Sequence, residues 1–230
     1  MSLGKLIAFE GVDASGKGTQ SKLLKERLVK EGFPTESISF PRHETIPGSF
    51  VDQYLIGHYG SLEDLDPKAC SIFYAIDRFD ASFEIRKWLN QGKVVISDRY
   101  TGSNKGHQTS KISDYSERLK FIDWANNLEY KIFNLPKEDI NIFLDMPVEW
   151  SFRLIAGRNN QISEVKKDLH EENSSHLYNT LNAYHELIEY ENNKNIGKWA
   201  PIDCVRNNEL LSVDEIHNTI WDTVKPLLYK

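Results

Sequence analysis

The chain has 230 residues and a formal net charge of -6, and apolar residues occupy 40% of its positions. This length is enough for one sizeable core, and the acidic balance argues against nucleic acid as the main partner, which needs clustered positive charge. Only two cysteines occur, Cys70 and Cys204, and they lack the spacing of a disulfide framework or a zinc site. Because no apolar run approaches the length of a membrane span, we expect a cytoplasmic protein with no membrane partner.

The first predicted element is a buried strand, Leu6 to Phe9, and a phosphate-binding loop follows it directly. Gly11 and Gly16 bracket four residues and Lys17 comes next, which gives the G-x-x-x-x-G-K core of a nucleotide-binding P-loop. The glycines allow a tight turn, so that backbone N–H groups and the start of the helix expected at 21–30 converge on phosphate oxygens. The loop consists of Gly11, Val12, Asp13, Ala14, Ser15, Gly16, Lys17, Gly18 and Thr19.

One position of this loop departs from the motif. The residue after the lysine usually carries a hydroxyl that holds Mg²⁺, but here it is Gly18, and Thr19 comes one position later. The ending GKGTQ resembles the adenylate kinase branch of the nucleoside monophosphate kinases. We therefore expect Mg²⁺ to be held by the phosphates, by water and by nearby carboxylates such as Asp13 or Asp98.

The remaining elements alternate in a way that is typical of a parallel sheet wrapped by helices. Further strands are expected at 36–40, 93–97, 140–144 and 199–204. Further helices are expected at 66–89, at 114–133, from Pro147 and after Ser212, with Asp66, the pair Asp114 and Glu117, and the pair Ser212 and Glu215 as caps. Residues 157–168 are polar and lack apolar periodicity, so we expect a mobile loop there. The prediction is a single α/β domain over residues 1–230.

Polar clusters follow several of these strands. Ligands gather at the carboxyl ends of the strands in open parallel sheets. Four clusters fall there: 11–19, 41–44, 98–108 and Asp145. Their convergence favours a phosphoryl-transfer site over a scatter of solvated loop charges.

The segment Asp98 to Gln108, DRYTGSNKGHQ, resembles the corresponding motif of the thymidylate kinases. FEGVD before the loop, FPR at Phe40 to Arg42 and FYAIDRFD at Phe73 to Asp80 carry the same resemblance. It covers the whole chain in order and is most specific in about the first 110 residues. The resemblance implies a three-layer fold of the P-loop NTPase type with a five-stranded parallel sheet, often assembled as a homodimer. It also implies Mg²⁺-dependent transfer of the γ-phosphoryl group of ATP, bound by residues 11–19, to dTMP.

The resemblance further implies roles for single residues. Arg42 and Arg99 would bind the acceptor phosphate, since guanidinium groups make bidentate contacts that lysine cannot. Tyr74 would stack on the pyrimidine ring, and Arg78, one helical turn later, would reach the base edge. Asp13 would contact the acceptor and, with Asp98, organise the metal. The dTMP pocket would comprise Asp13, Phe40, Arg42, Tyr74, Arg78, Arg99, Ser103, Asn104, His107 and Gln108.

The loop lacks the arginine that one branch of the family keeps at position 14, which is alanine here. Charge on the transferred group must then be offset from elsewhere, and the segment around 157–168 is the expected lid. Arg158 is the favoured lid cation, although Asp168 to Glu171 lacks the arginine of the usual lid motif. The expected catalytic residues are Lys17, Asp13, Arg99 and Arg158.

Two other functions are compatible with these features. One is a deoxynucleoside monophosphate kinase of broader specificity. The other is a P-loop protein that binds nucleotide without catalysis, for which Gly18 and the missing lid arginine are the best arguments. A guanine-binding Asn-Lys-x-Asp motif is absent from the sequence, which argues against a GTPase. His107 also stands where thymidylate kinases usually have tyrosine, which predicts weaker discrimination against ribose.

Overall fold

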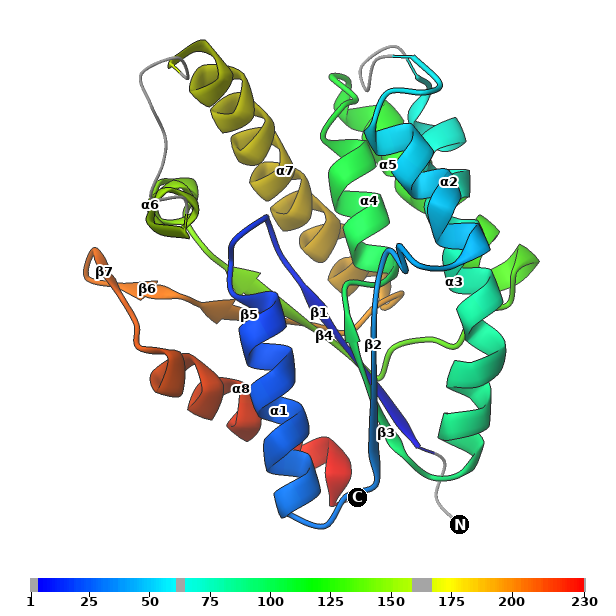
Figure 1. Ribbon diagram of the computed structural model, residues 1–230, viewed down its shortest axis with the longest axis vertical. Helices are drawn as coiled ribbons and strands as arrows, with labels where there is room; N and C mark the ends of the chain where they lie inside the picture. The colour runs from blue at the N-terminus through cyan, green and yellow to red at the C-terminus, as the bar shows by residue number, and fades with distance from the viewer. Residues whose placement is uncertain (1–3, 61–64, 159–166, 230) are drawn as a thin grey trace.

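The computed structural model describes residues 4–60, 65–158 and 167–229, and a parallel sheet of five strands forms its centre (Figure 1). The strands are β1 (Lys5–Glu10), β2 (Thr35–Ser39), β3 (Val94–Asp98), β4 (Ile140–Asp145) and β5 (Trp199–Asp203). Their order is β2-β3-β1-β4-β5, and every neighbouring pair is parallel. The predicted fold class is confirmed. Because β1 is central, the loop that follows it opens between its neighbours β3 and β4, where such sheets bind ligands.

Helices cover both faces of this sheet, and a short hairpin follows its last strand. The helices are α1 (Lys17–Lys30), α2 (Ile46–Leu55), α3 (Pro67–Asn90), α4 (Thr101–Thr109), α5 (Tyr115–Asn126), α6 (Val148–Arg158), α7 (Lys167–Lys194) and α8 (Val213–Leu228). A π-helical segment, η1 (Asn127–Ile132), continues α5, and β6 (Val205–Arg206) pairs with β7 (Glu209–Leu210). Among the helices described, none combines the length and the apolar character that a membrane crossing requires.

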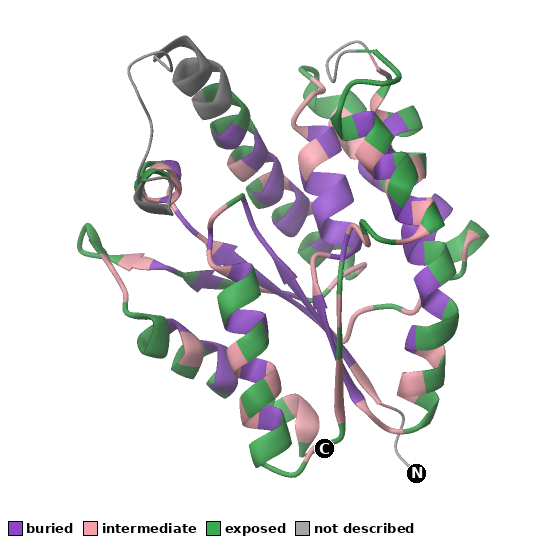
Figure 2. Cartoon of the chain, in the orientation of Figure 1, coloured by how far each residue is buried: buried purple, intermediate pink, exposed green. Residues whose placement is uncertain are grey.

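The central strand shows why both faces are covered. Ile7 and Phe9 pack with residues of α1 and α8, whereas Leu6 and Ala8 pack with residues of α3. Successive side chains of a strand point to opposite faces, so a strand that is apolar at every position must be buried on both sides. The buried strands between exposed outer helix faces are visible in Figure 2.

Most predicted helices are confirmed, with shifted ends. The Asp66 carboxylate caps α3 by accepting a hydrogen bond from the backbone N–H of Lys68 at 2.7 Å. Ser212 and Glu215 form the predicted capping box of α8. The helix expected at 114–133 ends its α-helical part at Asn126 and continues as η1. The first helix begins at Lys17, four residues earlier than the sequence pattern indicated, so its first turn belongs to the phosphate-binding loop.

Three helices, α2, α4 and α7, were not predicted. The sequence of α4, TGSNKGHQT, has poor helix formers and no apolar stripe, yet nearly all of it is buried. A side chain at Gly106 would place its Cβ 2.8 Å from the Tyr184 ring of α7, so glycine is needed for this close approach. Tertiary packing therefore forms α4 where local propensity does not.

The prediction of a loop at 157–168 was wrong at both ends of that range. Helix α6 extends to Arg158 and α7 begins at Lys167. Residues 159–166, between these helices, lie outside the described part of the chain.

Candidate active site

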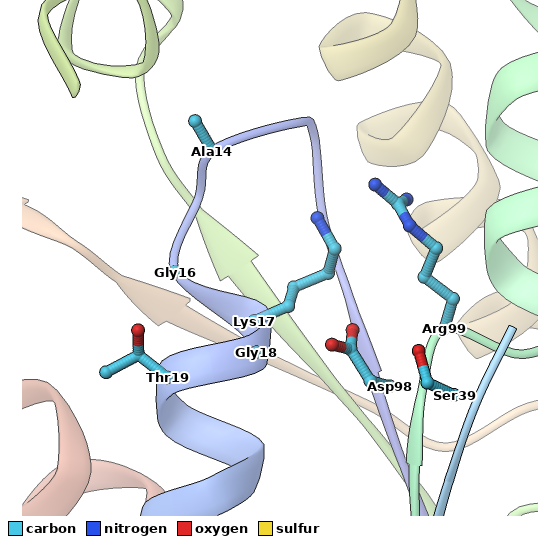
Figure 3. Close-up of a pocket in the computed structure, with 8 residues that line it drawn as sticks. All are labelled: Ala14, Gly16, Lys17, Gly18, Thr19, Ser39, Asp98 and Arg99. Atoms are coloured by element: carbon cyan, nitrogen blue, oxygen red, sulfur yellow. The ribbon is translucent and has the colours of Figure 1, made fainter. Parts of the chain in front are cut away.

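A cavity of about 330 Å³ lies at the carboxyl edge of the sheet, between the loop after β1 and the ends of β2 and β3 (Figure 3). It is lined by Ala14, Gly16, Lys17, Gly18, Thr19, Ser39, Asp98 and Arg99. The structure thus brings together two of the polar clusters expected from the sequence, 11–19 and 98–108. Backbone N–H groups at the start of α1 and two cationic side chains make this edge suitable for phosphate.

The amine of Lys17 lies under the phosphate-binding loop. It donates to the backbone carbonyls of Gly11 at 3.0 Å and Val12 at 2.7 Å, and to the Ser15 hydroxyl at 3.4 Å. Burial, together with the charge of Arg99, lowers the pKa of Lys17 to about 7. A phosphate beside the amine would act in the opposite direction and favour its charged form.

The Asp98 carboxylate stands close to the place where P-loops usually carry a hydroxyl. A Cβ on Gly18 would lie only 3.3 Å from Asp98 Oδ2. Burial raises the pKa of Asp98, and the charges of Lys17 and Arg99 act to lower it. The described residues hold no cluster of three or more metal-binding side chains, so Mg²⁺ at this edge would also need phosphate and water oxygens. The carboxylate oxygens of Asp98 fit that hard cation.

Three acceptors surround the guanidinium group of Arg99. Its Nη2 donates to Asp13 Oδ1, and its Nη1 lies 3.3 Å from both Ser103 Oγ and His107 Nε2. Burial and the charge of Arg99 lower the pKa of His107 to about 3, so the ring is neutral and its Nε2 can accept a hydrogen bond from the guanidinium N–H. Burial acts to raise the pKa of Asp13, but Arg99 brings it below its usual value. The structure therefore joins Asp13, Arg99, Ser103 and His107 in one network.

Arg42 is held by two acidic residues that were not assigned a role. Its Nε donates to Asp77 Oδ1 at 2.8 Å, and its Nη2 donates to Asp80 Oδ2 at 2.7 Å. Burial acts to lower the pKa of Arg42, and these hydrogen bonds raise it. The signal was present in the sequence, because both acids belong to the FYAIDRFD segment that carried the family resemblance.

Arg78 makes a buried ion pair that was not expected. Its Nε and Nη2 bind the two oxygens of Glu129 at 2.6 and 2.7 Å, and both side chains are at most 2% exposed. The Asn104 amide donates to the same carboxylate at 3.0 Å. Glu129 lies in η1, and no local feature of the sequence indicated that it would reach this site. The reach of Arg78 to a base edge stays a prediction.

Two buried carbonyl oxygens on α4 have no hydrogen-bond partner in the described part of the chain, Asn104 Oδ1 and Gln108 Oε1. Residues four apart share one face of a helix, so the two oxygens belong to the same face of α4. Buried acceptors are almost always paired, and a ligand with N–H donors would satisfy them. Tyr74 is half-buried on α3 and meets the Tyr54 ring edge-on, with centroids 6.1 Å apart.

For two other predicted site residues, Phe40 and Arg158, the structure does not test the predicted role. Phe40 is 4% exposed and packs against Tyr100 with ring centroids 5.8 Å apart, so its contact with a ligand stays a prediction. The side chain of Arg158 lies outside the described part of the chain, and its role as lid cation also stays a prediction.

Comparison with known proteins places this site in one family. The family model "Thymidylate kinase" matches residues 9–208. A thymidylate kinase of Dictyostelium discoideum is 31% identical over 147 residues, which is 64% of this chain and 60% of that protein. A thymidylate kinase of Plasmodium falciparum is 26% identical over 94% of this chain and 88% of that protein. The solved structure of thymidylate kinase from Candida albicans has a TM-score of 0.71 and 22% identity, and the match covers 99% of this chain and 93% of that one.

Proposed function

This chain belongs to the thymidylate kinase family, and we propose that it transfers the γ-phosphoryl group of ATP to dTMP, giving dTDP and ADP. The observation that carries the proposal is the arrangement of the loop at 11–19 and Arg99 around one cavity. The loop is suited to bind the phosphates of a donor nucleotide, and Arg99 is suited to bind the phosphate of an acceptor. Phosphoryl transfer demands little covalent chemistry from the protein beyond this positioning and charge stabilisation.

The donor half of the site would be the loop and the start of α1. Backbone N–H groups and Lys17 would bind the β- and γ-phosphates of ATP, and the amine would exchange its contacts with loop carbonyls for phosphate oxygens. Asp98, with Asp13, would hold Mg²⁺, which supplies positive charge to the phosphates when bound. Asp98 is the better placed of the two, because Asp13 already binds Arg99.

The acceptor half would be built on α3 and α4. Arg99 and Arg42 would bind the phosphate of dTMP in line with the donor, and their acidic partners hold both guanidinium groups in place beforehand. The base would lie against Tyr74, with its N–H facing an unpaired carbonyl oxygen of Asn104 or Gln108. Arg158 would supply the remaining cation when the segment between α6 and α7 excludes water from the site.

An ADP-release assay over a panel of nucleoside monophosphates tests this function. We expect dTMP to give the highest kcat/KM when ATP and Mg²⁺ are present. Comparable rates with dUMP, dGMP or dCMP would instead establish the kinase of broader specificity. ATP binding without ADP release on any acceptor would identify the non-catalytic nucleotide-binding protein. Omission of Mg²⁺ in the same assay tests the metal requirement.

His107 is expected to influence the choice between deoxyribose and ribose. Histidine is smaller than the tyrosine expected at this position, so His107→Tyr should crowd the 2′ position of the sugar. The ratio of kcat/KM for dTMP to that for ribothymidine monophosphate should then rise by about 10–200-fold. The substitution also removes one of the three acceptors of Arg99, but this loss affects both substrates and cancels in the ratio. An unchanged ratio would show that His107 does not read the sugar.

Three broader properties also belong to the proposal. A homodimer is supported by exposed apolar side chains on one stripe of α3, where Ile72, Phe79 and Phe83 are 39%, 38% and 61% exposed. The single-domain organisation over residues 1–230 is supported by the one five-stranded sheet of the described chain. A cytoplasmic location is supported by the two buried free cysteines, which suit a reducing compartment.

A further inference from the structure

Glu10 is a fully buried carboxylate at the end of β1, directly before the phosphate-binding loop, and the proposed mechanism gives it no role. Its Oε1 accepts a hydrogen bond from the backbone N–H of Tyr100 at 2.9 Å. Its Oε2 accepts from the Ser103 hydroxyl at 2.5 Å and from the Tyr184 hydroxyl at 3.2 Å. Among the described ion pairs none includes Glu10, so its charge is met by neutral donors rather than by direct contact with a cation. Burying a charge in this way is costly unless the hydrogen bonds are well made.

The Ser103 hydroxyl connects this carboxylate to Arg99. A serine hydroxyl has one proton to donate, and here it is given to Glu10. The oxygen is then left with lone pairs, which can accept from Arg99 Nη1 at 3.3 Å. The single proton of the Tyr184 hydroxyl is shared between this oxygen at 3.3 Å and Glu10 Oε2 at 3.2 Å. The direction of the bond to Glu10 therefore decides whether Ser103 can accept from the guanidinium. Hydrogen bonds linked in this way strengthen one another in a buried, low-dielectric setting.

Glu10 also holds the backbone that carries Arg99. Arg99 lies in the left-handed region with a φ of 65°, and the next residue, Tyr100, donates its N–H to Glu10. Tyr100 is the N-cap of α4 and makes no side-chain capping bond, so Glu10 binds the turn that leads into the helix. A Cβ on Gly102 would lie 2.9 Å from Glu10 Cδ, which shows how closely the first turn of α4 packs on the carboxylate.

We infer that Glu10 is a positioning residue that holds Arg99 in the orientation required for the acceptor phosphate, through Tyr100 on the backbone and Ser103 on the side chain. The inference rests on the proposed role of Arg99 in binding dTMP. Burial raises the pKa of Glu10, and the Ser103 hydrogen bond and the charge of Arg99 act against that rise, which agrees with a coupling between these groups.

The substitution Glu10→Gln changes the charge and the hydrogen-bonding pattern of this side chain but keeps its shape. Glutamine has one acceptor oxygen and one donor nitrogen, so it cannot accept from Tyr100 N–H on one side and from Ser103 on the other. If the amide nitrogen faces Ser103, the serine proton turns toward Arg99 and the guanidinium loses an acceptor. We expect kcat/KM for dTMP to fall about tenfold or more, as is common when a supporting partner of a functional group is removed, while the Kd for ATP stays within about twofold.

A double-mutant cycle distinguishes this role from a general loss of stability. If Glu10 acts through Arg99, Glu10→Gln should change kcat/KM less than about twofold in an Arg99→Ala background. Ser103→Ala, which removes only the bridging hydroxyl, should be non-additive with Arg99→Ala in the same way. The matched control is Glu191→Gln, because Glu191 is another buried carboxylate that binds α4, through Lys105 at 2.6 Å. It should lower the Tm and act additively with Arg99→Ala.

The outcomes separate the inference from the proposed function. An unchanged kcat/KM in Glu10→Gln, or an equal loss in the wild-type and Arg99→Ala backgrounds, would overturn the positioning role alone. Wild-type activity in Arg99→Ala would overturn the proposed role of Arg99 and this inference with it. Non-additivity of Glu10→Gln and Ser103→Ala with Arg99→Ala, beside an additive Glu191→Gln, would support the inference.

Discussion

Lys17→Ala is expected to abolish phosphoryl transfer and to leave the fold intact. The amine lies within hydrogen-bond distance of two loop carbonyls, so it can reach the phosphates that the loop would bind, and among the described residues no other lysine lines the cavity. Preorganised charges of this kind are worth about 10²-fold or more in kcat. The measurement is ADP release at saturating ATP and dTMP, with the far-UV circular dichroism of both proteins recorded beside it.

The fold should survive because burial already disfavours the charged form of this lysine. Its loss leaves the Gly11 and Val12 carbonyls without a donor, at a cost of about 1–3 kcal/mol. Lys22→Ala is the matched control, since Lys22 is exposed on the same helix, and it should keep full activity. Folded Lys17→Ala protein with near-wild-type turnover would contradict the assignment of Lys17 to the transferred phosphate.

Arg99→Ala should lower kcat/KM for dTMP by about 10²–10³-fold. The guanidinium borders the cavity and is positioned by Asp13, Ser103 and His107, so its removal takes away an oriented cation and leaves Asp13 without its partner. The Kd for ATP should change little, because the P-loop backbone is untouched. Steady-state kinetics with dTMP varied, together with calorimetric titration of ATP, would measure both effects.

Arg99→Lys provides a sharper form of the same test. Lysine keeps the charge but lacks the planar fork that binds a phosphate and three acceptors at once. We expect it to recover less than about a tenth of the wild-type kcat/KM. Arg86→Ala is the control, because Arg86 lies on α3 and binds Ser82 and the Asn134 carbonyl, outside the acceptor network. Full activity of Arg99→Lys would mean that charge alone suffices at this position.

The core strands could be predicted because each is a contiguous run of residues with a recognisable apolar pattern. Ile140 to Leu144 and Val94 to Ser97 are short runs that are apolar apart from Asn141 and Ser97, and the strands of a sheet buried on both faces are mostly apolar. The caps of α3 and α8 were predictable for the same reason, since Asp66 and Ser212 bond to backbone N–H groups two or three residues away. The phosphate-binding loop is likewise a contiguous motif.

The sequence predicted which residues lie on the acceptor side of the site, but it did not predict how they are oriented. Arg42, Arg99 and Asn104 were expected there. Their supporting acids were not: Asp77 binds Arg42, Glu129 binds Asn104, and Glu10 acts on Arg99 through Ser103. These partners give the arginines their orientation, and so they decide which group of each side chain is available to a ligand. The pairing of Arg78 with Glu129 shows the consequence, because a residue expected to reach the base is bound on two of its nitrogens by the protein.

Helix α4 shows which part of this structure depends on contacts between residues that are far apart in the sequence. The sequence alone was enough for the parallel sheet, the phosphate-binding loop and the family resemblance, because each depends on residues close together in the chain. It was not enough for α4, whose polar side chains are buried against Glu10 of β1, Glu129 of η1 and Glu191 of α7. The hydrogen bond between Glu10 and Tyr184 spans 174 residues. Contacts over such distances form only when the sheet and its helices are assembled, and they offset the poor helix propensity and the burial of polar groups that local patterns count against a helix.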